Sequence, residues 1–153
     1  MDFIYGWAAE GLYSQLQVSI PPANSKHNDD MRNIIQQYFK GLELGDATLL
    51  ILLFSENGIV HSPLYGDMHA KNFYNDLFAD TTQSSISLLN IFDNSEKSNV
   101  FAAHFIYEWM LKDGNKTKFE CVDIFQFDTQ SKISELTIIY DTYQVRRIFN
   151  KLR

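Results

Sequence analysis

Residues 99–127 read NVFAAHFIYEWMLKDGNKTKFECVDIFQF and predict a β-hairpin. Both arms are rich in β-branched and aromatic residues, and the Asp113-Gly114 pair between them is typical of a tight turn. One arm contains a carboxylate, Asp123, among Phe, Val, Ile and Cys residues. Burial of a carboxylate raises its pKa unless hydrogen bonds stabilise the charged form. The hairpin therefore predicts a chemical site around Asp123.

Composition narrows the classes of protein to which the chain can belong. Its 153 residues, 45% of them hydrophobic, suffice for one buried core and are too few for two domains. The net charge of −6 and the scattered basic residues argue against a nucleic-acid groove. A single cysteine, Cys121, excludes an internal disulfide and indicates a reducing, cytoplasmic compartment. Since no run of 18 apolar residues occurs, we expect no membrane span.

The first 28 residues are expected to form an arm and linker, followed by a single domain over residues 29–153. Apolar residues recur at helical spacing in residues 1–18, whereas SIPPANSKHNDD (19–30) holds two of the three prolines. The arm would pack on the domain or on a second subunit. The alternative is a frayed tail, which is common at chain ends.

Periodicity predicts an α+β domain. Apolar residues at helical spacing indicate three helices ending near residues 44, 54 and 78, with a short strand at 59–62 between the second and third. Four strands follow, at 84–92, 99–111, 116–127 and 132–140, and then a helix at 142–150. We expect a curved four-strand antiparallel meander, shaped as a cone with a cavity and covered by the three helices. Large residues on both strand faces, such as Val122 and Phe125, favour a homodimer formed through the sheet.

Three segments resemble the NTF2-like superfamily, especially its SnoaL-like and ketosteroid isomerase branches. They are IIQQYFKGLELGDATLLILLFSENGIVHSP (34–63), KNFYNDLF (71–78) and DGNKTKFECVDIFQFDTQSKISEL (113–136). The resemblance covers residues 31–140. It implies the cone-shaped fold and a cavity for a small hydrophobic molecule that carries oxygen, without a cofactor.

The resemblance also implies roles for individual residues. Tyr38 stands where ketosteroid isomerases have the tyrosine of the oxyanion hole, and Asp123 where they have a protonated aspartate that donates beside it. Tyr74 matches a second tyrosine that supports the first by a hydrogen bond. Ser62 stands where the catalytic base, an aspartate before a proline, is expected, and serine cannot remove a carbon-bound proton unaided. Asp141, in IIYDTY (138–143), resembles a late aspartate of SnoaL-like cyclases and epoxide hydrolases.

The length of the hairpin turn decides which side chains accompany Asp123. A two-residue Asp113-Gly114 turn would put His104 opposite Asp123, on one face with Ile106, Glu108 and Met110. A three-residue turn would instead bring inward Phe105, Tyr107 and Trp109. We expect the two-residue turn. The candidate catalytic residues are then Tyr38, Asp123, His104 and Asp141, and the candidate ligand-binding residues are Ser62, Tyr74, Ile106, Glu108, Met110 and Leu136.

Each candidate also has a structural interpretation. Asp123 can be a buried acid that bonds the backbone, Tyr38 ordinary helix core, and Asp141 a cap for the last helix. Cys121 is expected to be a small core residue, and His61 to lie outside the cavity. The four histidines show no metal-ligand spacing, so no metal is expected.

Two functions therefore remain open. One is a cofactor-independent enzyme of isomerase, cyclase or hydrolase type. The other is a non-catalytic module that binds a ligand in its cavity or a partner on its sheet.

Overall fold

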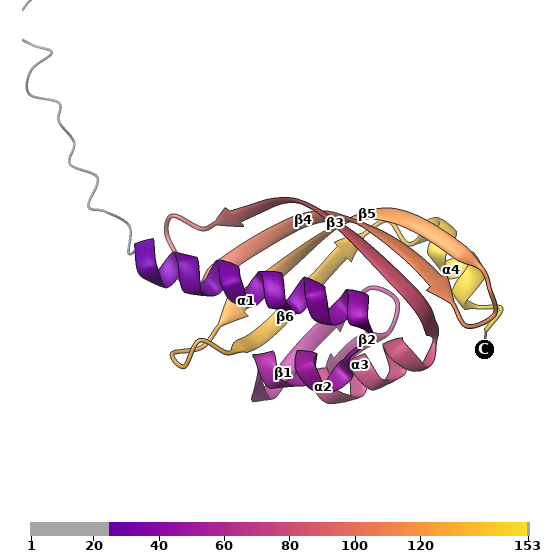
Figure 1. The fold of residues 1–153 in the computed structure, drawn as a ribbon, viewed down its shortest axis with the longest axis horizontal. Coiled ribbons are helices and arrows are strands. Elements are labelled where there is room, and N and C mark those ends of the chain that lie inside the picture. Colours follow the sequence, from indigo (N-terminus) through magenta and orange to yellow (C-terminus); the bar gives the residue numbers. More distant parts are fainter. Residues whose placement is uncertain (1–24, 153) are drawn as a thin grey trace, which may run out of the picture.

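The computed structural model describes residues 25–152, so residues 1–24 of the expected N-terminal arm and linker lie outside the described residues (Figure 1). Residues 25–28 were expected to belong to the linker, but they form the start of the first helix. Within this range the helices are α1 (Ser25–Leu44), α2 (Ala47–Leu53), α3 (Ala70–Ala79) and α4 (Tyr143–Phe149). The strands are β1 (Phe54–Ser62), β2 (Gly66–His69), β3 (Thr81–Asp93), β4 (Val100–Leu111), β5 (Lys116–Phe127) and β6 (Ile133–Tyr140). The expected α+β class is confirmed.

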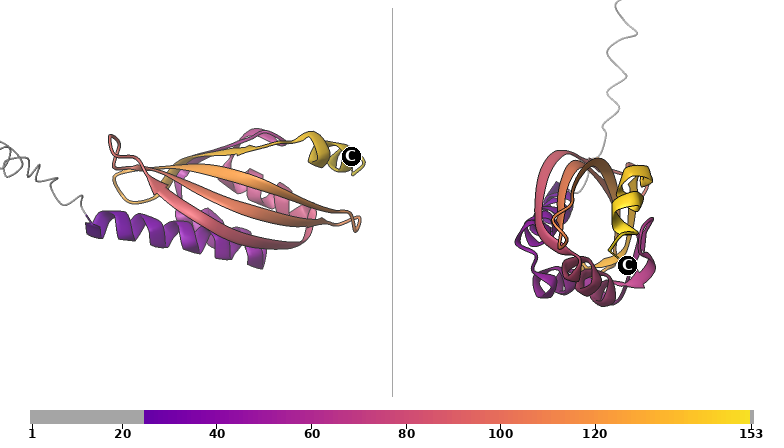
Figure 2. Two further views of the ribbon diagram at one scale, coloured as in Figure 1. Left: turned by 90° about the horizontal axis from the view of Figure 1, so that it is seen from above. Right: turned by 90° about the vertical axis from the view of Figure 1, so that its right-hand side faces the viewer.

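The strands form one six-stranded sheet in the order β2-β1-β6-β5-β4-β3. Neighbouring strands are antiparallel except for β1 and β6, which are parallel. The sheet curls into an unclosed arc, and helices α1 to α3 lie along its open side (Figure 2). The four-strand meander is thus extended by β1 and β2, which join it through β6. Among the described residues, no helix is long and apolar enough to cross a membrane.

Helix α1 supplies one wall of the core. Its residues Met31, Ile35, Tyr38, Phe39 and Leu42 recur every three or four positions and are all buried. The helix ends at Gly45, whose φ of 65° is a left-handed conformation that glycine adopts without strain. Asp46 then caps α2 by accepting a hydrogen bond from the Leu49 amide at 2.9 Å.

The prediction for residues 54–78 differs from the structure in two places. The short strand expected at 59–62 begins at Phe54, and the Asn57-Gly58 pair lies inside β1, where the pairing with β6 shifts register. A side chain at Gly58 would come within 3.1 Å of the Ile133 carbonyl oxygen, so glycine permits the close approach of β1 and β6. The third helix begins at Ala70 because β2 occupies the residues before it.

The expected register of the hairpin was also wrong. Its loop has three residues, 112–114, closed by a hydrogen bond from the Leu111 amide to the Asn115 carbonyl at 2.9 Å. Gly114 takes a φ of 86°, and Asp113 accepts from the Asn115 backbone amide at 3.0 Å. One extra residue in the loop moves every side chain of one arm to the opposite face. Asp123 therefore lies opposite Ala103 rather than His104.

Candidate functional site

A small apolar cavity lies between the inner face of the sheet and helices α1 and α3. Its volume is about 50 Å³, which is room for roughly four water molecules. Aromatic side chains form most of its wall, among them Tyr38, Phe105, Tyr107, Trp109, Phe119 and Tyr140. The stacked pair Phe119 and Tyr140, with ring centroids 4.3 Å apart, forms a flat part of this wall.

Asp123 lies in the middle of β5 and faces this cavity with only 1% of its surface exposed. Its Oδ2 accepts a hydrogen bond from the Tyr38 hydroxyl at 3.1 Å, and its Oδ1 accepts one from the Cys121 thiol at 3.4 Å. Burial raises the pKa of Asp123 from 3.8 to about 7, and the two hydrogen bonds oppose this rise without cancelling it. Both protonation states of the carboxyl group are therefore populated near neutral pH.

The two states do different chemistry. The carboxylate uses both oxygens to accept from Tyr38 and Cys121. The carboxylic acid has a proton that it can donate to an acceptor in the cavity. The arrangement can thus act as a hydrogen-bond donor or as a general acid toward an oxygen atom.

Tyr38 projects from α1 and is held by aromatic contacts. Its ring packs edge to face on Phe125 and Phe39, with centroids 5.1 and 5.2 Å away. Burial raises the pKa of its hydroxyl well above the usual value, with a further contribution from the nearby Asp123. Tyr38 therefore stays protonated and donates to Asp123.

Tyr74 lies beside Tyr38, with ring centroids 6.3 Å apart. Tyr38 partly offsets the effect of burial on the pKa of Tyr74, although no hydrogen bond of ordinary length joins the two hydroxyls. The Tyr74 hydroxyl is buried without a hydrogen-bond partner among the described residues. Its pKa is raised, mainly by burial, so the hydroxyl keeps its proton. Tyr74 packs on Phe54 and Phe73 as part of the core instead of lining the cavity.

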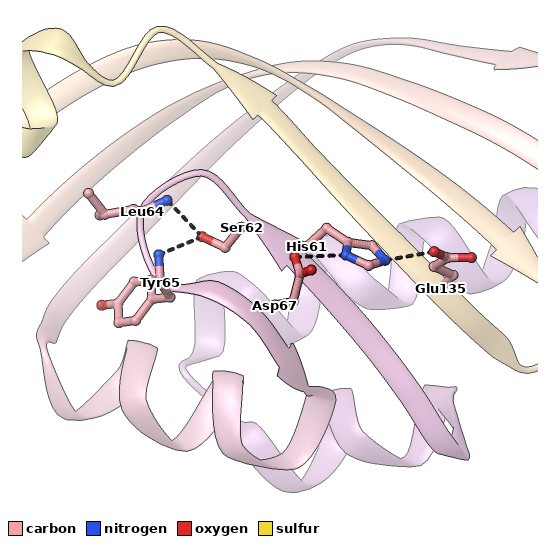
Figure 3. Close-up of polar contacts among 6 residues, drawn as sticks. All are labelled: His61, Ser62, Leu64, Tyr65, Asp67 and Glu135. Carbon is pink, nitrogen blue, oxygen red and sulfur yellow. Dashed lines mark hydrogen bonds and ion pairs between the residues drawn. The ribbon is translucent and has the colours of Figure 1, made fainter.

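Ser62, at the end of β1, lines the cavity and is 8% exposed. Its Oγ accepts hydrogen bonds from the amides of Leu64 and Tyr65 at 3.2 and 3.1 Å (Figure 3). Both bonds use the oxygen as acceptor, so the hydroxyl can still donate toward a ligand. Among the described residues, no side chain forms a hydrogen bond with this hydroxyl.

The shift in register moves four candidates out of the cavity. His104, Ile106, Glu108 and Met110 alternate with the buried residues of β4 and so lie on the outer face of the sheet. There His104 bonds Glu120 and Asn90, and Glu108 forms an ion pair with Lys118 at 2.7 Å. The cavity instead receives the three residues of the alternative register, which are Phe105, Tyr107 and Trp109.

Two further candidates also lie away from the cavity. Asp141 is exposed and accepts a hydrogen bond at 2.9 Å from the amide of Tyr143, the first residue of α4, whose N-cap position is taken by Thr142. Leu136 is fully buried, but it packs in the core outside the cavity lining. His61 lies outside the cavity, as expected, bonded to two carboxylates.

Sequence reasoning missed the part played by Cys121. It was expected to be a small core residue, but its thiol donates to Asp123 and lines the cavity. The signal was present, because residues two apart in a strand share a face. Burial and the nearby Asp123 raise the pKa of the thiol, so it remains a neutral donor.

Comparison with known proteins identifies the fold. No protein-family model matches the chain, and no curated protein matches it in sequence. Solved structures do match. An NTF2-like protein of unknown function from Exiguobacterium superimposes with a TM-score of 0.61 at 16% identity, over 71% of this chain and 98% of the other. The chain has the NTF2-like fold.

The chain also superimposes on an enzyme and on a protein described as a putative cyclase. The epoxide hydrolase/cyclase-like enzyme SalBIII, with a role in pyran ring formation in the polyether salinomycin, superimposes with a TM-score of 0.65 at 16% identity, over 78% of this chain and 94% of its own. A putative polyketide cyclase from Xanthomonas campestris gives a TM-score of 0.68 at 10% identity, over 79% and 97%. At these identities the likeness establishes the fold alone.

Proposed function

We propose that the protein binds a small, neutral, hydrophobic molecule in this cavity and that protonated Asp123 donates to a carbonyl, hydroxyl or ether oxygen of that molecule. The observation that carries the proposal is a carboxyl group with a pKa near 7, fixed by Tyr38 and Cys121 within an apolar aromatic wall. Perturbed titratable groups in pockets are frequent at functional sites.

The cavity wall favours neutral ligands over anions. Among residues 25–152, no lysine, arginine or histidine lines it, so a carboxylate or phosphate would be desolvated there without a cationic partner from this part of the chain. Above the pKa of Asp123, an anion would also meet a like charge. Ser62 offers a second donor for a polar group on the ligand.

The proposed chemistry is transfer of a proton from Asp123 to the oxygen of the ligand, as in an isomerase, cyclase or hydrolase. The carboxylate that remains would be stabilised by the hydrogen bonds from Tyr38 and Cys121. SalBIII, which has the same fold, is an epoxide hydrolase/cyclase-like enzyme, and this is the reason for proposing an epoxide or a related ring oxygen as the acceptor.

Binding of anisole, whose ether oxygen only accepts hydrogen bonds, is expected to depend on pH in a way that reports Asp123. Anisole should bind weakly below pH 6 and about tenfold less tightly above pH 8, because the ionised carboxyl has lost the proton that it donates. Chemical-shift changes of Asp123 and Trp109 during NMR titrations measure this affinity. Toluene tests the need for oxygen, and benzoate the exclusion of anions. Equal affinity at both pH values, or tighter binding of benzoate, would contradict the proposal.

A second candidate function is a non-catalytic ligand-binding module. Two observations favour it, namely serine at position 62 and a cavity of only about 50 Å³. Hydrolysis of styrene oxide separates the two functions, since protonation of the epoxide oxygen allows water to open the ring and form a diol. Turnover that is lost in Asp123→Asn supports the enzyme. Anisole binding without any turnover of this epoxide supports the module.

We also propose that the protein forms a homodimer through the outer face of the sheet. Ile106, Val122, Ile124 and Ile139 give this face an apolar centre, and Ile139 is 50% exposed. Charged residues such as Glu108, Lys118 and Glu120 surround it, as a polar rim surrounds an interface core.

Substituting Ile139→Lys is expected to raise the dimer dissociation constant on the order of tenfold or more, because it would bury a charge at the centre of the interface. Sedimentation equilibrium at micromolar concentration measures the constant. Leu52→Lys is the matched control, since Leu52 is 65% exposed but lies on α2, away from the sheet face. A monomeric wild-type protein at these concentrations would refute the dimer.

A further inference from the structure

His61 lies on the outer face of β1, between the edge strand β2 and the neighbouring strand β6. Its Nδ1 is 2.8 Å from the Asp67 Oδ1 on β2, and its Nε2 is 2.6 Å from the Glu135 Oε1 on β6 (Figure 3). One imidazole ring therefore connects three strands. Strand β2 has four residues and, in the part of the chain that the structure describes, pairs with β1 alone, so the side-chain link adds to a short backbone pairing.

The two contacts require two protons on the ring. A carboxylate only accepts hydrogen bonds, and a neutral imidazole carries a single N–H. Both distances are therefore compatible only with the imidazolium form, whose charge also strengthens each bond. Loss of one proton leaves a ring-nitrogen lone pair facing a carboxylate, which breaks one of the two links.

His104 provides a contrast on the same face of the sheet. Its Nε2 bonds the Glu120 carboxylate, whereas its Nδ1 is 3.3 Å from the amide nitrogen of Asn90, which donates. A neutral imidazole satisfies both partners, donating through Nε2 and accepting through Nδ1. His61 differs because it has a carboxylate at each nitrogen.

The link at His61 is adjacent to the cavity wall. The next residue, Ser62, holds the turn that follows by accepting from the amides of Leu64 and Tyr65. The Arg146 guanidinium on α4 donates to the carbonyl of Pro63 in the same turn at 2.7 Å. Ser62, Leu64 and Tyr65 all line the cavity. Hairpin β1–β2 is thus fixed by His61 on its outer face and by Ser62 on its inner face.

We propose that protonated His61 is a clamp that fastens β2 and β6 to β1, and that loss of its proton loosens the cavity wall formed by Ser62, Leu64 and Tyr65. This regulation concerns the wall itself and stands whether or not the cavity binds a ligand.

The charged groups around His61 set the direction of the effect. The hydrogen bond to Asp67 contributes most to raising the pKa of His61 above 6.5. Burial opposes this rise and is the next largest effect, and the hydrogen bond to Glu135 adds to the rise. His69 lies on the same face, two residues along β2 from Asp67. Because the folded-state pKa of His61 is raised, the stabilisation is complete below pH 6.5 and is lost as the pH rises through the folded value.

Amide hydrogen exchange, corrected for the intrinsic pH dependence of exchange, tests the clamp. The Leu64 and Tyr65 amides should lose roughly two- to fivefold in protection as His61 deprotonates, the size expected of one partly exposed ion pair. NMR of the His61 ring nitrogens in the same samples should show both nitrogens protonated at pH values below the one at which protection falls. Amides in the centre of β5 serve as the internal reference.

Variants make the test specific. In Glu135→Gln the ring remains but one carboxylate is gone, so the pKa of His61 should fall and the change in protection should follow it to lower pH. His61→Gln should show low protection of Leu64 and Tyr65 at every pH, and His104→Gln should behave as wild type. The clamp is refuted if His61 titrates at or below 6.5, or if protection of the two amides changes equally in wild type and His61→Gln.

Discussion

Replacing Asp123 by Asn is expected to remove a pH dependence of stability that the wild-type protein shows between pH 4 and pH 7. The pKa of the carboxyl is 3.8 when it is exposed and about 7 in the folded protein, where burial disfavours its charge. Between these values the unfolded chain is ionised while the folded chain keeps its proton. Stability therefore falls as the pH rises through this window.

The expected size of this effect is large. The difference in the pKa of Asp123 between the folded and unfolded states changes the free energy of unfolding by about 4 kcal/mol at most. Asn carries no charge at any pH and still offers an oxygen to Tyr38 or Cys121. Asp123→Asn should thus have similar stability to wild type at pH 4 and greater stability at pH 8. Urea unfolding of both proteins across this range gives the difference.

Asp113 offers a control in which the change of stability with pH has the opposite sign. It is exposed in the hairpin loop, and hydrogen bonds from Asn115 lower the pKa of its carboxyl. Asp113→Asn should therefore lose stability relative to wild type above pH 4 and not below pH 3. An Asp123→Asn variant whose stability difference from wild type is constant between pH 4 and pH 8 would show that Asp123 titrates as an ordinary carboxylate. The proposed donor role would then fail.

Replacing Phe125 by Ala is expected to lower the free energy of unfolding by about 3–5 kcal/mol. Phe125 is fully buried, and its ring packs on Tyr38 at 5.1 Å and on Phe127 at 6.4 Å between centroids. Its removal leaves a void beside Tyr38, so the hydrogen bond to Asp123 should also weaken. Urea unfolding measures the first effect, and the NMR-determined pKa of Asp123, which should rise, measures the second.

Phe92→Ala is the matched control, because Phe92 is 54% exposed on the edge strand β3. It should change stability by less than about 1 kcal/mol. A loss of less than that for Phe125→Ala would mean that the aromatic contacts around Tyr38 do not hold the site.

Helix α1 and strand β5 show what local sequence can predict. The buried stripe of α1 and its end at Gly45 follow from helical spacing and from the conformational freedom of glycine. The bounds of β5 were predicted to the residue, because the strand lies between two strong turn signals. The resemblance in residues 34–63 and 113–136 selected Tyr38 and Asp123, and the structure brings these two side chains into contact.

The composition of the cavity wall could not be obtained in this way. It depends on whether the hairpin loop has two or three residues, and the Asp113-Gly114 pair fits both. Asp113 bonds Asn115 and Gly114 adopts a positive φ, which selects the longer loop. The additional residue in the loop places Phe105 on the inner face of β4 and His104 on its outer face.

The sequence by itself determined the α+β class, the course of most helices and strands, and the presence of a carboxylate in an apolar strand, because these depend on neighbours a few residues apart. Only the tertiary structure decided that β1 pairs in parallel with β6, that Cys121 donates to Asp123, and that His61 joins Asp67 to Glu135. The pairing of β1 with β6 and the contact of His61 with Glu135 join segments more than 70 residues apart. The orientation of the Cys121 thiol depends on the burial of both Cys121 and Asp123. Packing of the whole sheet fixes such contacts.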